Sequence, residues 1–120
     1  MNKISDSELE VMKILWEKGA ITSPEIINAL SKSVDWSRNT IKTLITRLVN
    51  KKVIEQKKED GQLYIYKPLI SEKEYKKIEN ENFVTKLYKG SINNMLLNFV
   101  EEKQISKKDL EKLLEIIERE

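Results

Sequence analysis

The chain has 120 residues, of which 39% are hydrophobic and 35% charged, and its formal net charge is +2. This length predicts one domain, or one small domain with an appendage. The absence of cysteine and histidine excludes disulfide bonds and thiolate metal sites and removes the commonest general base, so we expect no enzyme, metal or cofactor.

No stretch approaches the roughly 18 consecutive apolar residues that a membrane span needs. The first ten residues, MNKISDSELE, also lack the apolar segment of a secretion signal. We therefore expect a cytoplasmic protein without membrane insertion, which the lack of cysteine fits.

The first helix is predicted to run from about Ser5 to Lys18. Ser5 followed by Glu8 is the signature of a capping box, and Gly19 ends the helical pattern. Residues 20–22 form a short extended connector. Ser23 and Pro24 then supply an N-cap and a proline at the first helical position of a second, short helix.

The third predicted helix starts after Ser37 and has two distinct faces. Apolar residues recur at i, i+3, i+4 and i+7 on one side: Ile41, Leu44, Ile45 and Leu48. Polar and basic side chains, with almost no acid, occupy the other: Asn39, Lys42, Thr43, Thr46, Arg47 and Asn50. An ordinary solvated face mixes both signs of charge, so this composition favours the major groove of DNA.

The basic charge is concentrated around this helix. Residues 32–58 contain eight basic and two acidic side chains, a net charge of +6, whereas residues 71–120 have a net charge of −1. A basic segment of this kind is typical of a phosphate-binding surface. We read Trp16 and Trp36 as core or helix-end aromatics in preference to base-stacking residues.

Two β-prone runs, 53–58 and 63–67, flank Asp60-Gly61 and predict a hairpin. Both faces of the second run are apolar, and periodicity leaves open which of them is buried. Three helices followed by a hairpin give the winged-helix order. Residues 1–70 are thus expected to form a winged helix-turn-helix DNA-binding domain in a mainly α fold with a small β-hairpin.

Residues 71–120 are predicted to form three further amphipathic helices, which begin near Ser71, Ser91 and Ser106. About fifty residues are too few for a self-sufficient core, so we expect this region to dimerise with a second copy of the chain. The expected dimerisation residues are Leu87, Tyr88, Ile92, Met95, Leu96, Phe99, Leu110, Leu113, Leu114 and Ile117.

The expected partner of the N-terminal domain is double-stranded DNA. The predicted DNA-binding residues are Arg38, Asn39, Lys42, Thr43, Thr46, Arg47, Lys51, Lys52, Lys57 and Lys58. The expected phosphate contacts are Lys51, Lys52, Lys57 and Lys58. The side chains expected at base edges or nearby phosphates are Asn39, Lys42, Thr43 and Arg47. The alternative is a helical interaction module whose basic face binds an acidic protein.

Several segments resemble the BlaI/MecI penicillinase-repressor family. They are ELEVMKILW at 8–16, WS at 36–37, TI at 40–41, TLITRL at 43–48, YIY at 64–66, YKG at 88–90 and LNFVE at 97–101. The resemblance implies a homodimeric winged-helix repressor that binds inverted repeats at the promoters of β-lactam resistance genes. It also implies that a sensor-linked protease inactivates the protein by cutting between Asn98 and Phe99.

Two departures from the family pattern affect these expectations. Members often carry Pro-Lys where this chain has Arg38-Asn39, so the preferred operator is expected to differ. A copper-responsive branch carries a C-terminal cysteine cluster, and the absence of cysteine here argues against copper sensing.

Overall fold

The computed structural model describes residues 3–59, 61 and 63–119. The chain forms two compact units, residues 1–75 and 76–120. The first unit extends beyond the predicted boundary at residue 70 because Tyr75 is buried there, with its ring centroid 5.5 Å from that of Trp16. Within the described residues, no helix is both long and apolar enough to cross a membrane.

Helix α1 (Asp6–Lys18) begins with the predicted capping box: the Ser5 hydroxyl accepts from the Glu8 amide, and the Glu8 carboxylate accepts from the Ser5 amide. Helix α2 (Ser23–Leu30) begins one residue earlier than predicted. Its N-cap is Thr22, because a second capping box joins Thr22 and Glu25. The prediction of Ser23 as N-cap was therefore wrong.

Helix α3 (Arg38–Asn50) is capped by Ser37, whose hydroxyl accepts from the Thr40 amide at 3.1 Å. Its predicted apolar stripe is buried in full. The helix ends in a Schellman motif, in which the amides of Val53 and Lys52 donate to the carbonyls of Leu48 and Val49. Lys52 takes the left-handed position, with φ of 61°.

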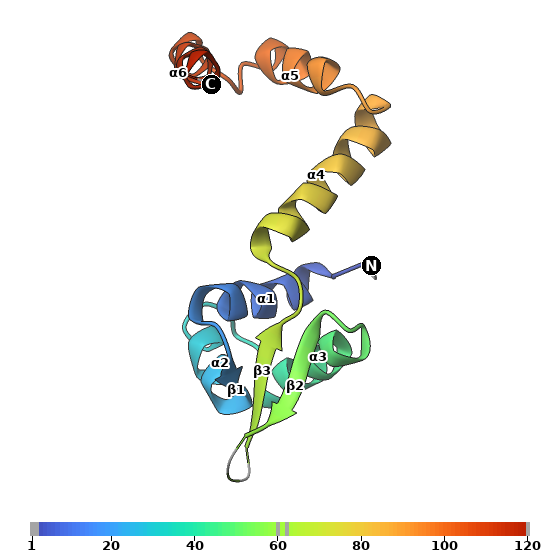
Figure 1. The fold of residues 1–120 in the computed structure, drawn as a ribbon, viewed down its shortest axis with the longest axis vertical. Helices are drawn as coiled ribbons and strands as arrows, with labels where there is room; N and C mark the ends of the chain where they lie inside the picture. The colour runs from blue at the N-terminus through green and yellow to red at the C-terminus, as the bar shows by residue number, and fades with distance from the viewer. Residues whose placement is uncertain (1–2, 60, 62, 120) are drawn as a thin grey trace. The chain divides into compact units, whose positions relative to one another are not determined.

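The sheet has three antiparallel strands in the order β1-β3-β2: β1 (Ile21–Thr22), β2 (Ile54–Lys58) and β3 (Tyr64–Pro68). The sequence predicts β2 and β3 but not β1, which is too short to show a periodicity. The wing is the β2–β3 hairpin (Figure 1). Residues 60 and 62 of its predicted turn lie outside the described residues.

The core of the first unit lies between α1, α2, α3 and the sheet (Figure 1). Its buried apolar side chains are Ile4, Val11, Met12, Leu15, Ile21, Ile26, Leu30, Ile41, Leu44, Ile45, Leu48, Val53, Ile54 and Tyr75. Trp16 and Trp36 pack against this core, and the Trp16 indole donates to the Ile70 carbonyl at 2.9 Å. Both tryptophans therefore have the structural role that we expected.

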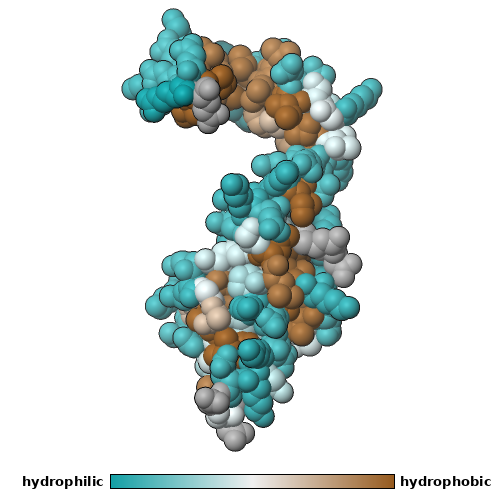
Figure 2. All heavy atoms as spheres, in the orientation of Figure 1, coloured by the Kyte–Doolittle hydropathy of each residue, from teal (hydrophilic) through white to brown (hydrophobic). Residues whose placement is uncertain are grey.

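The remaining helices are α4 (Glu72–Tyr88), α5 (Ile92–Glu101) and α6 (Lys107–Glu118). The predicted serine hydroxyls accept at the start of each, at Ser71, Ser91 and Ser106. Apolar side chains remain on the surface of α5 and α6 (Figure 2). These helices thus present apolar surface that the described residues of this unit leave exposed.

Candidate DNA-binding surface

The exposed face of α3 is a shallow depression lined by polar and basic side chains: Asn39, Lys42, Thr43, Thr46 and Arg47. Each is exposed, while the apolar residues between them are buried. The helical period separates the two sets, since the apolar stripe packs against α1 and turns the polar residues outward. The structure thus brings together five of the ten predicted contacts in one place.

The two threonines on this face are fixed by bonds within the helix. The Thr43 hydroxyl donates to the Asn39 carbonyl and the Thr46 hydroxyl donates to the Lys42 carbonyl, both at 3.0 Å. Because the hydroxyl proton is already engaged, each threonine offers a partner its methyl group and an acceptor oxygen. Such side chains suit contact with the thymine methyl group or with a base amino group.

The cations of α3 are not neutralised by neighbouring carboxylates. None of the ion pairs formed among the described residues involves Arg38, Lys42 or Arg47, and α3 itself contains no acid. These three charges are therefore available to phosphates or to guanine edges.

The predicted wing lysines lie on opposite faces of the sheet. Lys58 pairs with Tyr64 and Lys57 with Ile65, and neighbouring residues of a strand point to opposite sides. Gln56 pairs with Tyr66, which packs against the core. Lys58 lies two residues from Gln56 and therefore on the same, core-facing side of the sheet. The Lys58 ammonium group is 5.7 Å from the Tyr64 ring centroid.

A second depression joins α3 to the start of α2 and to β3. It is lined by Ser23, Lys42, Ile45, Thr46 and Tyr66. The sequence does not predict Ser23 or Tyr66 as site residues, because only the pairing of β1 with β3 brings them beside α3. Burial, together with the neighbouring Tyr64, raises the pKa of Tyr66, so its hydroxyl stays protonated and able to donate.

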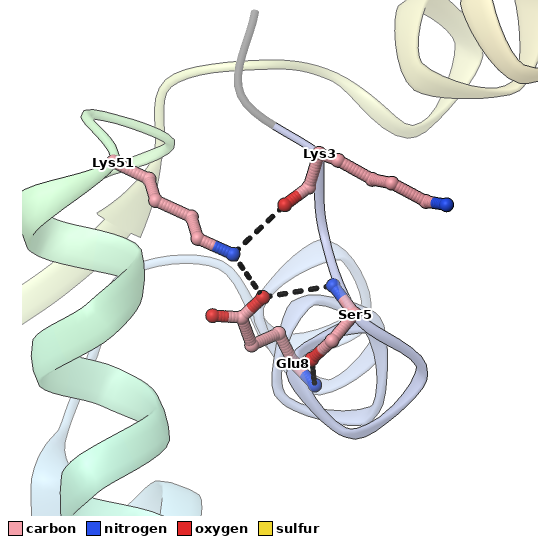
Figure 3. Close-up of polar contacts among 4 residues, drawn as sticks. All are labelled: Lys3, Ser5, Glu8 and Lys51. Atoms are coloured by element: carbon pink, nitrogen blue, oxygen red, sulfur yellow. Dashed lines mark hydrogen bonds and ion pairs between the residues drawn. The ribbon is translucent and has the colours of Figure 1, made fainter.

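The ammonium group of Lys51 is bonded within the protein and is not free for DNA. Its Nζ lies 2.5 Å from Glu8 Oε1 and 2.8 Å from the Lys3 carbonyl (Figure 3). Glu8 is 1% exposed. Burial raises the pKa of Glu8, but the bonds from Lys51 and Ser5 and the Lys51 charge outweigh it and leave the pKa below its ordinary value. We therefore leave Lys51 out of the proposed DNA contacts, while Lys52 stays exposed.

The other predicted site residues lie in the second unit. Asn98 and Phe99 are half-buried in the last two turns of α5, and the Asn98 side-chain oxygen accepts from the Tyr88 hydroxyl at 3.0 Å. Of the expected dimerisation residues, six are exposed: Leu87, Ile92, Leu96, Leu113, Leu114 and Ile117. The others are half-buried: Tyr88, Met95, Phe99 and Leu110.

Three helices, a three-stranded sheet with a wing, and a basic face on α3 define a winged-helix DNA-binding protein. Residues 4–119 match the family model described as Penicillinase repressor. The chain belongs to this family, whose characterised relatives are DNA-binding transcriptional repressors and not enzymes.

Two relatives show how far the similarity extends. The chain is 40% identical to the penicillinase repressor of Bacillus licheniformis over 116 residues, which cover 97% of this chain and 90% of that protein. It is also 40% identical to the methicillin resistance regulatory protein MecI of Staphylococcus aureus strain N315, over 98% of this chain and 94% of that protein.

One solved structure supports the same assignment, and a second shares only the fold. The monomeric form of Bacillus licheniformis BlaI in complex with the blaP half-operator is 43% identical. It aligns with a TM-score of 0.55 over 62% of this chain and 89% of that one. The Staphylococcus aureus regulator MepR, 17% identical with a TM-score of 0.52 over 98% of this chain and 77% of that one, shares the fold.

Proposed function

We propose that the chain represses transcription by binding an inverted-repeat operator as a homodimer in the cytoplasm. The observation that carries this proposal is the exposed face of α3, where the cations have no acidic neighbour on the helix and the polar groups suit base edges. A helix of this width fits the major groove of B-DNA. The structure of BlaI in complex with the blaP half-operator supports DNA as the partner.

Salt-titrated binding tests the proposal. The probe is a duplex that the chain selects from a random library, compared with a random duplex of equal length. We expect the chain to prefer the operator by roughly 10³-fold or more and to lose affinity steeply as salt rises. Equal affinity for both duplexes would reject a specific repressor and favour a basic module for acidic proteins.

The homodimer is supported by the apolar surface of α5 and α6. Ile117, for example, is 68% exposed and Ile92 is 59% exposed. Contiguous apolar surface of this kind marks an interaction site, and two copies of one chain are the commonest arrangement in soluble oligomers. Two linked recognition helices would then bind two half-sites, which raises affinity beyond that of one.

We further propose that the repressed genes confer β-lactam resistance and that a sensor-linked protease relieves repression by cutting the Asn98–Phe99 bond. The names of the penicillinase and methicillin-resistance relatives support the first part. For the second, the bond lies in α5 among exposed apolar side chains, so a cut there would remove surface that the dimer needs.

The Asn98→Ala variant tests the cleavage proposal. We expect it to bind operator normally but to stay intact when cells that carry the cognate sensor are treated with a β-lactam. Immunoblotting of the repressor with time after treatment measures this. Cleavage of Asn98→Ala at the same bond and rate as the wild type would remove the role assigned to Asn98.

A further inference from the structure

The contact between Glu8 and Lys51 joins two segments that are 43 residues apart in sequence. Glu8 lies in the first turn of α1, while Lys51 is the C-cap residue of α3. The Lys51 ammonium group also donates to the Lys3 carbonyl, and the same Glu8 oxygen accepts from the Ser5 amide. The end of α3 is thus tied to the start of α1 (Figure 3).

This tie differs in kind from the packing around it. Apart from Glu8, the buried residues of α1 and α3 are all apolar, and apolar burial is non-directional. Hydrogen bonds to a charged group are directional and strongly dependent on geometry. Glu8 is the one buried charged residue in the described part of the chain, and its second oxygen, Oε2, has no hydrogen-bond partner there.

A buried ion pair is weak support for stability, because desolvation offsets much of the attraction between the charges. Its geometric effect is larger. The 13 residues of α3 rise about 1.5 Å each, so a tilt of about 5° at Lys51 would move Arg38 by roughly 1.5 Å. A shift of that size would spoil hydrogen bonds to base edges while leaving looser phosphate contacts in place.

We infer that Glu8 is a positioning residue for α3: by holding Lys51, it fixes the orientation of the recognition helix and so sharpens discrimination between operator and random DNA. Glu8 itself lies buried away from solvent and touches no base. Lys51 serves the same purpose and is not a phosphate contact. Because this role rests on the proposed operator binding, its test also measures helix orientation without DNA.

The test replaces the pair by two apolar side chains in the full chain, Glu8→Met with Lys51→Met. Methionines avoid the unpaired buried charge that a single Lys51 substitution would leave. The matched control is Glu10→Gln, which breaks an exposed pair with Lys13 in the same helix. The probes are a duplex that the wild-type chain selects from a random library and a random duplex of the same length.

We expect the double variant to stay folded and to lose at least about fivefold of its preference for the selected duplex over random DNA. This loss is the lower end of the effect of one mismatched base pair. Its affinity for random DNA and its salt slope should not change. Glu10→Gln should match the wild type. An unchanged preference in the double variant would overturn the inference, and a salt slope reduced by about 0.9 would make Lys51 a phosphate contact instead.

Residual dipolar couplings of the DNA-free proteins provide the second readout. We expect the angle between α1 and α3 to change or to broaden in the double variant and to stay fixed in Glu10→Gln. An unchanged, equally ordered angle would also overturn the inference. If the wild type itself prefers no duplex, the proposed function fails, while the couplings still decide whether Glu8 positions α3. The single variant Glu8→Gln, measured in the same way, serves if the double variant does not fold.

Discussion

At the scale of single residues, the exposed face of α3 carries two kinds of side chain, charged ones and threonines. Arg38, Lys42 and Arg47 carry charge without a neighbouring acid on the helix, whereas Thr43 and Thr46 present methyl groups because their hydroxyl protons are bonded within the helix. Charge supplies affinity for any duplex, while methyl and amide groups distinguish bases. Substitutions of the two kinds should therefore have different effects.

Replacing Arg47 by Ala should weaken operator binding without changing dimerisation. The expected cost is about 1–3 kcal/mol if Arg47 contacts a base, and the salt slope should fall by about 0.9 if it contacts a phosphate. Fluorescence anisotropy at several salt concentrations measures both. Lys112→Ala, in α6, is the control, and normal operator binding by Arg47→Ala would show that the face is wrongly assigned.

The Glu8 carboxylate should make folding stability depend on pH. Its pKa in the folded chain lies below the ordinary value of 4.5, so its stabilising effect is present above pH 4.5 and is lost as the pH falls toward the folded pKa. Glu8→Gln should be less stable than the wild type at pH 7, and the difference should shrink below pH 4.5. Thermal unfolding over this pH range checks the sign, and a constant difference would contradict it.

At the scale of elements, the ends of α3 and α5 show how local bonding stops a helix. Each closes with the two hydrogen bonds of a Schellman motif. Lys52 and Lys103 occupy the left-handed positions, with φ of 61° and 60°, where glycine is usual because a side chain is strained there. The left-handed backbone of Lys52 therefore strains the end of α3, and glycine at this position would relieve the strain.

Replacing Lys52 by Gly should raise the free energy of unfolding above that of Lys52→Ala by about 0.5–1 kcal/mol, because the strain of the left-handed conformation exceeds the entropy that glycine loses on folding. Urea denaturation measures the difference. Both variants lack the same charge, so their affinities for DNA should fall equally. A less stable glycine variant would mean that Lys52 makes contacts that outweigh the strain.

At the scale of the whole molecule, the proposed DNA-binding face and the proposed dimer surface lie in different units. The basic face belongs to residues 1–75, whereas the exposed apolar side chains of α5 and α6 belong to residues 76–120. Each function should therefore respond to substitutions in its own unit. A change in the second unit reaches DNA binding through the number of half-sites held at once.

Replacing Leu96 or Leu113 by Asp should disrupt the dimer first and weaken operator binding as a consequence, while affinity for a single half-operator stays unchanged. A charge placed on an apolar interface is costly to desolvate. Sedimentation equilibrium gives the dimer constant. Lys112→Asp, on the opposite side of α6, is the matched control, and an intact dimer in both leucine variants would place the interface elsewhere.

Local sequence signals determined the helices, the wing strands and the basic face of α3. Capping boxes, turn residues and apolar spacing act over a few positions, so each could be read without knowledge of the fold. The one cap that was wrong, Ser23 in place of Thr22, differs by a single residue because the neighbouring hydroxyls compete for the same role.

Tertiary structure decided what depends on distant pairing. The register of Ile21 with Tyr66 creates β1 and brings Tyr66 beside α3. The pairing of β2 with β3 decides that Lys58, and not Lys57, lies on the core-facing side of the sheet. Lys51 looked like any exposed lysine until the fold set it against Glu8, 43 residues away. Such pairings form when the core closes and leave no periodic pattern in the sequence. The sequence alone therefore determined which side chains carry charge, whereas the fold determined which of these charges form ion pairs.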